Sequence, residues 1–284
     1  LTQIVPRERL IEAHAKNALA SSGSEVVGPA TAGALIKLMG APLALLADAL
    51  LLLTSATILR KIHIKEVREI PKDAHFWRDL KTGLQFVAHN QILVALAIMV
   101  GTWQMAYNAA LVVQILFATR ILGLSEHAVG LSYVSMGIGA ILASTVGNRI
   151  SKAYGPGVCM IAGIALSGVG WGLLALAPAN HWGVFAFALM LTCFAIGGVF
   201  IFINFLALRQ AVTPEPLLGR MTSTMRWLIL LPAGPGALLG GWLGEHFGLR
   251  STLAFSCLSA LCLAFFAWRN PTIRSITSLP SLPK

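Results

Sequence analysis

Long apolar segments alternate with short polar connections along most of this chain. A membrane-spanning helix needs about 20 mostly apolar residues, and the pattern predicts eight such segments. Only Met39 and Gly40 separate the first two, so we expect a tight helical hairpin there. The pattern therefore predicts an all-α, polytopic membrane bundle of eight transmembrane helices. The predicted spans are 18–38, 41–59, 92–117, 128–146, 158–176, 184–208, 225–243 and 249–268.

A long polar stretch, residues 60–90, separates the first two spans from the other six. It holds seven Lys or Arg against four acids, and Trp77, Leu80, Leu84 and Val87 fall on one face of a short helix. Such a basic amphipathic helix suits the cytoplasmic lipid surface. The alternative is a solvated linker whose apolar stripe packs on the protein itself, and this is compatible with a position at the lipid surface. We expect four parts: 1–59 as the end of one half, 60–90 as a cytoplasmic linker, 91–270 as a six-helix half, and 271–284 as a cytoplasmic tail.

Composition supports a membrane protein and argues against a nucleic-acid-binding protein. The chain is 56% hydrophobic and 11% charged, whereas soluble domains are roughly a quarter charged. The net charge of +10 comes mostly from Lys and Arg in short loops. With the linker in the cytoplasm, most of these loops fall on the same side. We therefore expect a multi-pass protein of the cell inner (plasma) membrane, with the lipid bilayer as a partner, no nucleic acid, and both ends in the cytoplasm.

The two hairpins of the predicted bundle resemble one another in sequence. VPRERL at 5–10 resembles VTPEPL at 212–217, and Gly33 precedes Gly240 by the same offset of 207 positions. Chance similarity between glycine-rich spans is the alternative. If the two halves are equivalent, four spans belong before the first one. The chain also opens at Leu1 inside a polar loop, so we expect it to be helices five to twelve of a twelve-helix protein.

Five stretches, in this order, resemble a known family. They are VPRERLIEAHA, GPATAG, APLALLADAL, LKTGLQFVAHNQIL and TRILGLSEHAVGL. Together they resemble the major facilitator superfamily, and within it the branch of bacterial exporters that includes the enterobactin exporter and macrolide efflux proteins. The resemblance implies a secondary, proton-coupled exporter of a drug-like or siderophore-like small molecule that works by alternating access. Its substrate and protons would then be its partners. The alternative is a truncated, non-transporting remnant of such a transporter.

The family's cytoplasmic loop motif has a counterpart here in GNRISKAYG, residues 147–155. The resemblance assigns Gly147, Arg149, Lys152 and Gly155 to this motif. Ser151 stands where the full pattern has an acid, which weakens the expectation of a gating salt bridge at this loop.

Two acids lie inside predicted spans, Glu25 in the first and Asp48 in the second. Ionisable groups there are costly and usually face a cavity or a partner, and a carboxylate in a low-dielectric site can bind a proton near neutral pH. Both are therefore candidates for proton coupling. The structural alternatives are an interface carboxylate for Glu25 and a hydrogen-bonding acid for Asp48. Arg226 opens the span 225–243, where snorkelling to the cytoplasmic edge accounts for it.

Polar and aromatic side chains cluster in the span 92–117, which lines the central cavity in the family that the chain resembles. Amide and aromatic groups there can hold a polar-aromatic solute by hydrogen bonds and stacking, and the alternative role is hydrogen bonding between helices. The cavity candidates are Trp103, Gln104, Tyr107, Asn108 and Gln114, with Asn204 as a weaker one.

Small residues and prolines mark the two hairpins. We expect these residues to allow close packing of helices. A functional role would be a hinge or seal in alternating access. The positions are Gly28, Pro29 and Gly33 in the first hairpin and Pro235, Gly236 and Gly240 in the second.

Catalytic and nucleotide-binding motifs do not occur in the sequence. A GxxxxGK[ST] loop is missing, and so are HExxH, CxxC and GxSxG patterns. The four cysteines lie inside apolar segments and are expected to be inert small hydrophobes. We expect no enzyme activity, no cofactor and no metal site. A channel would need a selectivity ring, which the sequence does not contain.

Overall fold

A computed structural model describes residues 24, 31, 35, 39–40, 42–60, 76–214 and 217–276 of the chain. Helices dominate these residues, and no strand occurs among them. Seven described helices are long and apolar enough to cross a membrane, which confirms the predicted fold class. The eighth predicted span, 18–38, lies outside the described residues apart from isolated positions. The seven are Pro42–Arg60, Gln91–Ile121, Glu126–Tyr154, Pro156–Leu176, Trp182–Ala211, Leu218–Phe247 and Leu249–Arg269.

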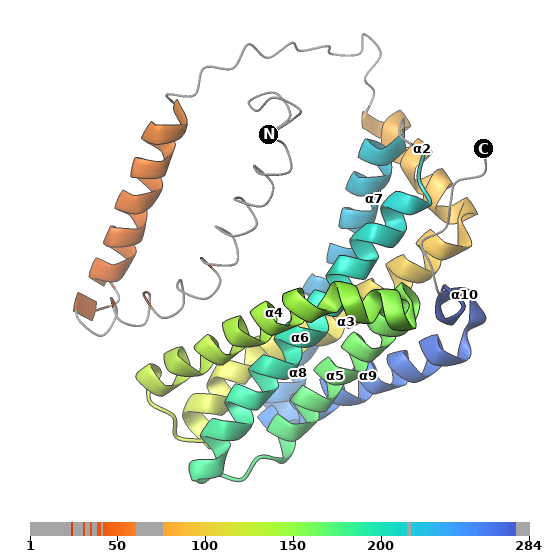
Figure 1. Cartoon of the computed structure of the whole chain (residues 1–284). Coiled ribbons are helices and arrows are strands. Elements are labelled where there is room, and N and C mark those ends of the chain that lie inside the picture. Colours follow the sequence, from red (N-terminus) through yellow and green to blue (C-terminus); the bar gives the residue numbers. More distant parts are fainter. Residues whose placement is uncertain are drawn as a thin grey trace.

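Six of these spans form a bundle (Figure 1). In it, α5 packs between α6 and α9, α4 packs on α6, and α3 packs on α8 and α9. The helix α3 ends in a short π-helical turn, η2, at Phe117–Ile121. The helices of the bundle are α3 (Gln91–Leu116), α4 (Glu126–Tyr154), α5 (Pro156–Leu176), α6 (His181–Ala211), α7 (Leu218–Leu230), α8 (Ala233–Phe247) and α9 (Leu249–Arg269).

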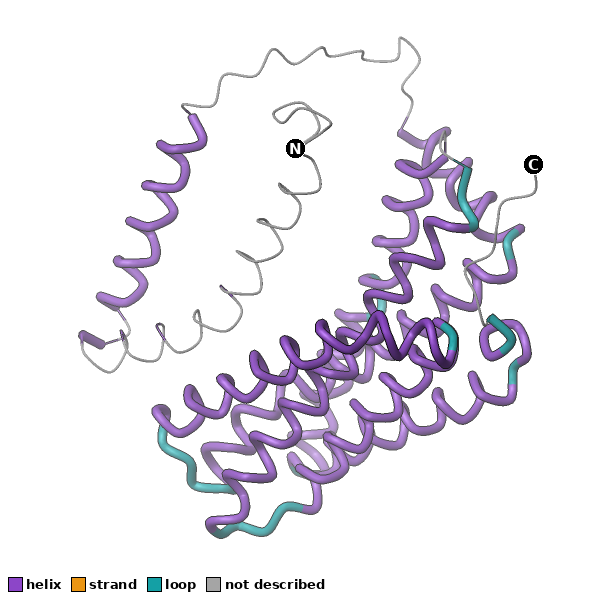
Figure 2. The backbone as a smooth tube through the Cα atoms, viewed as in Figure 1, coloured by secondary structure: helices purple, strands orange, loops and turns teal. Residues whose placement is uncertain are grey.

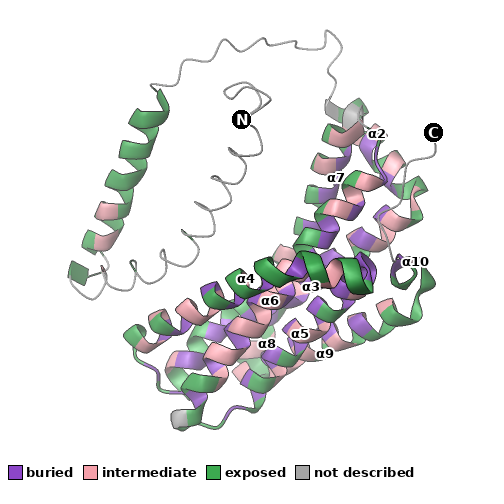
Figure 3. Cartoon of the chain, in the orientation of Figure 1, coloured by how far each residue is buried: buried purple, intermediate pink, exposed green. Residues whose placement is uncertain are grey.

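The outer surface of this bundle is apolar, as expected for a protein whose solvent is lipid. Buried residues follow the inner helix faces, and exposed ones cover the outside (Figure 3). Leu176 and Leu238 are 82% and 77% exposed although each lies on a membrane-length helix. Water would make such exposure unfavourable, whereas hydrocarbon tails are as apolar as leucine itself.

Glycine lets α8 approach the backbone of α3. Gly236 lies against Met105, and Gly240 lies against Ala109, where an added Cβ would be 2.6 Å from the Ala109 Cα atom. The Ser256 hydroxyl of α9 also donates a hydrogen bond of 2.9 Å to the Ala106 carbonyl of α3. Close backbone approach and hydrogen bonds between helices replace the hydrophobic effect as the cohesive forces inside a membrane.

The span expected at 225–243 begins seven residues earlier than the sequence pattern indicates. It runs from Leu218 to Phe247 and consists of α7 and α8, which meet in a turn at 231–232. The pattern missed the first two turns because Gly219, Arg220 and a run of hydroxyl residues lower their hydropathy. Arg226 therefore lies on the third turn of α7, roughly 12 Å along the axis from Leu218 at 1.5 Å per residue. The apolar part of the span nevertheless starts beside Arg226, after the polar turns at 219–224, so the snorkelling of Arg226 to the cytoplasmic edge stays a prediction.

The predicted amphipathic helix in the linker exists as α2, Phe76–His89. One edge of its apolar stripe packs on α7, since Val87 is buried and an added Cβ on Gly83 would collide with the Arg220 and Thr224 region of that helix. The other edge remains outside, with Trp77 77% exposed and Leu84 45% exposed. Packing on the protein thus uses part of the stripe and leaves part of it open.

Two further segments flank the bundle. The helix Pro42–Arg60 has no buried residue in its apolar stretch, and it stands apart from the bundle in the trace (Figure 2). At the other end, the short helix α10 (Pro271–Arg274) begins the expected tail. Its Ile273 is buried and meets the backbone of Gly157 at the start of α5, so this part of the tail is docked on the bundle.

Candidate substrate-binding site

A stack of aromatic rings joins α3 to α6 at the level of the predicted cavity residues. The Trp103 ring lies 5.8 Å from both Tyr107 and Phe194 in stacked geometry, and Tyr107 lies 4.7 Å from Phe194. Phe202 meets Trp103 edge-on at 5.8 Å, and Trp171 of α5 approaches Phe194 at 6.1 Å. Offset and edge-on pairs of this kind add to the packing that apolar area provides.

Trp103 forms the buried centre of this stack. Only 1% of its surface is exposed, and its indole nitrogen Nε1 has no hydrogen-bond partner in the part of the chain that the structure describes. Tyr107 and Phe194 are half-buried and form the accessible edge of the stack. The structure thus places Trp103 behind the candidate surface and Tyr107 on it.

Gln104 and Asn108 lie on α3 beside Tyr107 and are half-exposed. The Asn108 amide nitrogen donates a hydrogen bond of 2.8 Å to the Gln104 carbonyl of its own helix. Among the described residues, the side-chain amide of Gln104 has no hydrogen-bond partner. This face of α3 therefore presents amide groups and an aromatic ring that can contact a solute.

The other two amide candidates are already engaged within the bundle. Gln114 is buried, and its amide donates a hydrogen bond of 3.2 Å to the Tyr133 hydroxyl of α4. Asn204 is also buried; its carbonyl oxygen accepts a hydrogen bond from the Ser151 hydroxyl, and its amide donates one of 2.8 Å to the Phe200 carbonyl. Gln114 and Asn204 therefore form hydrogen bonds within and between helices, which is the role that was the alternative to lining the cavity.

The motif predicted as a cytoplasmic loop is mostly helical: Gly147, Arg149 and Lys152 lie in the last turns of α4, and only Gly155 lies between α4 and α5. It has two buried glycines and two exposed cations. Gly147 faces the Phe200 ring, and Gly155 has a φ of +87°, which a glycine adopts without strain as α4 ends and α5 begins. Arg149 and Lys152 are exposed. Within the described residues, neither forms an ion pair.

The proton-coupling candidates have little described context. Glu25 lies outside the described residues, as do Gly28, Pro29 and Gly33. Asp48 lies on the helix Pro42–Arg60 and is exposed there.

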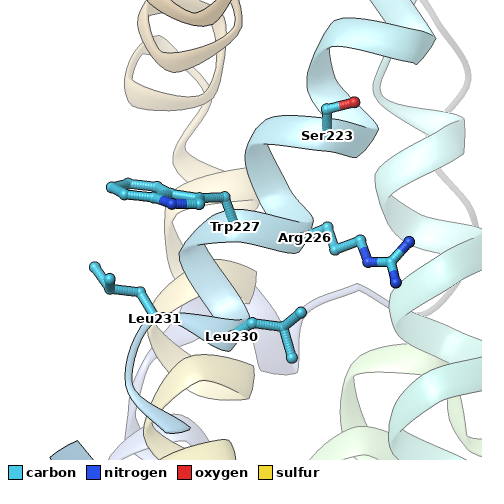
Figure 4. Close-up of a pocket in the computed structure, with 5 residues that line it drawn as sticks. All are labelled: Ser223, Arg226, Trp227, Leu230 and Leu231. Atoms are coloured by element: carbon cyan, nitrogen blue, oxygen red, sulfur yellow. The ribbon is translucent and has the colours of Figure 1, made fainter. Parts of the chain in front are cut away.

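An open pocket of roughly 470 Å³ lies on one side of α7 (Figure 4). The sequence did not predict it, although four of its five lining residues fall inside the span expected at 225–243. Arg226 and Trp227 leave the helix in different directions and flank the pocket. The lining residues are Ser223, Arg226, Trp227, Leu230 and Leu231.

Sequence reasoning also missed the interhelical role of Arg250. Its guanidinium donates hydrogen bonds of 2.7 Å to the carbonyls of Ala175, in the last turn of α5, and Ala177, which follows the helix. It also lies 5.4 Å from the centre of the Phe117 ring in η2. Gly248, with a φ of +88°, turns the chain immediately before α9 and so places Arg250 at this junction. Only the glycine two residues before Arg250 hints at this arrangement in the sequence, because glycine is the residue that adopts a positive φ most readily.

Metal and disulfide chemistry find no support among the described residues. No group of three His, Cys, Asp or Glu side chains comes together in that part of the chain. The four cysteines are free thiols on three different helices.

Comparisons with known proteins are consistent with this architecture. The family model for the Major Facilitator Superfamily matches residues 104–280. The chain is 26% identical over 247 residues to the enterobactin exporter EntS of Salmonella choleraesuis and equally to that of Salmonella typhimurium. These matches cover 85% of this chain and 56% of each relative, so the chain spans about half the length of the curated relatives. No solved structure gives a significant match. With more than half of its residues inside the family match and a helical membrane bundle as its fold, the chain belongs to the major facilitator superfamily, a family of membrane transporters and not of enzymes.

Proposed function

We propose that this protein is a secondary exporter that moves an aromatic or otherwise drug-like small molecule out of the cell by alternating access. The observation that carries the proposal is the accessible face of α3, where Gln104, Tyr107 and Asn108 lie together in front of a buried aromatic stack. Amides select polar groups, and the ring offers a flat apolar surface. The direction of transport is proposed from the relatives, which are named as exporters.

Alternating access requires two helical halves that move as rigid bodies around a central site. We propose that the six spans in 91–270 form one half, that 1–59 belongs to the other, and that 60–90 joins them in the cytoplasm. The close α3–α8 contact at Gly236 and Gly240 supports rigidity of the half that is described. Pro235, beside the break between α7 and α8, is a candidate hinge, and the end of α4 with Arg149 and Lys152 is a candidate gate.

We propose a proton as the coupling ion, with Asp48 and Glu25 as the carboxylates that bind it. The support is their position inside apolar segments, where an ionised acid is unfavourable and a protonated one is not. Placement in the inner membrane with both ends in the cytoplasm is proposed from the excess of Lys and Arg in the loops on one side.

Efflux assays in cells that carry the intact gene test the substrate site. Cells are loaded with a panel of fluorescent aromatic compounds, and retention is compared for the native protein and for the variants Gln104→Ala and Asn108→Ala. We expect each variant to slow efflux of the transported compound about fivefold, because one lost bond to a polar group is worth on the order of 1 kcal/mol.

The matched control is Thr145→Ala. Thr145 is exposed on α4, and its hydroxyl donates to the Leu142 carbonyl of the same helix, so its removal should leave efflux unchanged. If Gln104→Ala and Asn108→Ala were as active as Thr145→Ala, the α3 face would not be the substrate site.

A further inference from the structure

Two arginines where α9 meets α10 each lie over an aromatic ring. The Arg269 guanidinium carbon is 5.9 Å from the centre of the Phe265 ring, and that of Arg274 is 4.6 Å from the centre of the Trp268 ring. Both arginine side chains are exposed. Arg269 is the last residue of a helix that is long and apolar enough to cross a membrane, so both cations lie near the boundary between hydrocarbon and headgroups.

The short helix α10 is docked on the bundle beside the last turns of α9 (Figure 1). Ile273 and Ile276 are 2% and 8% exposed, and the Gly157 amide at the start of α5 donates a hydrogen bond of 3.5 Å to the Ile276 carbonyl. A side chain at position 157 would collide with the Ile273 carbonyl. The docked backbone therefore holds Arg274 in place over Trp268.

No acid neutralises these two cations within the described part of the chain. Neither guanidinium forms a hydrogen bond or an ion pair with a described residue. The helices on which α10 packs, α3, α5 and α9, contain no Asp or Glu at any position. A guanidinium that lies over a ring keeps N–H donors for an oxygen anion. The two positive charges at this end of the bundle are therefore open to an anionic ligand.

The rings beside the cations add an apolar surface. Phe265, Phe266 and Trp268 are 57%, 67% and 43% exposed. Tryptophan is enriched where a membrane meets water, because one part of its side chain is apolar and another polar. Positive charge at headgroup depth next to exposed rings matches a phospholipid, whose phosphate is anionic and whose acyl chains are apolar. A free phosphate would use only the charge.

We propose that Arg269 and Arg274 bind the phosphate group of an anionic phospholipid, whose acyl chains lie along the exposed rings of α9. Guanidinium and phosphate pair through two parallel hydrogen bonds, and each cation near an anionic lipid surface strengthens binding about fivefold. Because α10 packs on three other helices, a lipid bound here stabilises the tail and the bundle together. The site is separate from the α3 face, so the proposal does not depend on which compound is transported.

Native mass spectrometry of the purified full chain in an uncharged detergent measures the affinity for the first bound lipid. Phosphatidylglycerol is compared with phosphatidylcholine, which has the same acyl chains and no net charge. We expect the native chain to bind phosphatidylglycerol at least tenfold more tightly. Arg269→Gln and Arg274→Gln should each weaken phosphatidylglycerol binding about fivefold and leave phosphatidylcholine binding unchanged. In parallel, phosphatidylglycerol should raise the melting temperature of the native chain and not that of the double variant.

Two further variants separate the site from general effects of charge and packing. Arg120→Gln removes one exposed cation from the end of another membrane-length helix, and it should leave the preference for phosphatidylglycerol unchanged. Trp268→Leu keeps an apolar side chain but removes the ring under Arg274, so it should weaken phosphatidylglycerol binding roughly threefold. If the arginines only stabilised the fold, their variants would melt at a lower temperature without lipid and would bind both lipids as the native chain does, which would overturn the proposal.

Glycerol 3-phosphate distinguishes a lipid site from a site for a soluble anion, because it carries the phosphate without acyl chains. At the concentrations at which phosphatidylglycerol binds, it should neither bind nor raise the melting temperature. Equal stabilisation by glycerol 3-phosphate would assign the cations to a soluble anion and overturn the lipid site. Equal affinities of the native chain for the two lipids, or an equal loss of phosphatidylglycerol binding in Arg120→Gln and Arg274→Gln, would also overturn it.

Discussion

Gly240 of α8 lies against the backbone of Ala109 of α3, and this contact leaves no space for a side chain. Gly236 repeats the arrangement one turn earlier against Met105. The two helices thus meet backbone to backbone along one face, and they hold together the part of the bundle that carries the accessible amides of α3. Loss of this contact would move the candidate site as well as loosen the fold.

Substitution of Gly240 tests the contact. Gly240→Ala should destabilise the purified protein by about 1–3 kcal/mol, because the new methyl group forces the α8 and α3 backbones apart. Gly241→Ala is the matched control, since an added Cβ there meets no atom within 4 Å, and it should be neutral or slightly stabilising because alanine favours helix. The measurement is the melting temperature of both variants in detergent. Equal melting temperatures would show that the helices do not meet at Gly240.

Arg250 is predicted to stabilise the junction of η2, α5 and α9. Arg250→Gln should lower stability by about 1–2 kcal/mol, because the carbonyls of Ala175 and Ala177 lose a charged donor. Arg250→Lys should recover only part of this, since one ammonium group does not reproduce the planar fork. Thermal unfolding with Arg120→Gln as the control measures the effect. A variant Arg250→Gln as stable as the native chain would contradict this role.

Seven of the eight predicted spans are described as membrane-length helices, and these followed from hydropathy alone because about 20 apolar residues in lipid have few other options. Individual side-chain roles did not follow in the same way. The sequence pattern does not distinguish the buried residues Trp103, Gln114 and Asn204 from residues on the accessible face. Their exposure depends on which neighbouring helix covers them, and contacts far apart in sequence decide this. The start of α7 was missed for a related reason: its polar first turns are helical because they pack on α2, which a hydropathy window does not register.

The buried residue Trp103 and the accessible residue Gln104 of α3 should respond differently to removal of their side chains. Trp103→Ala should unfold or severely destabilise the protein, by about 3–5 kcal/mol, because it removes the buried centre of the ring stack. Gln104→Ala removes only a half-exposed amide and should leave the melting temperature within about 1 °C while efflux falls. Circular dichroism and efflux of both variants provide the comparison. A stable, fully folded Trp103→Ala would contradict the structural role of the stack.

Proton coupling is tested at Asp48. Asp48→Asn should abolish the dependence of efflux on the proton gradient, because the amide cannot release a proton. Efflux is measured across a pH series in everted vesicles from cells with the intact gene, with Thr54→Ala on the same helix as a control. A pH response identical to that of the native protein would remove Asp48 from this role.

Whole-cell accumulation of small molecules tests the central claim most directly. A strain with the intact gene, a strain in which it is deleted and a complemented strain are each incubated with a panel of aromatic acids, bases and neutral compounds. The exporter account predicts that the deletion strain retains at least one compound of the panel several-fold more than the other two. Equal retention of every compound in all three strains would contradict it and would favour a non-transporting protein.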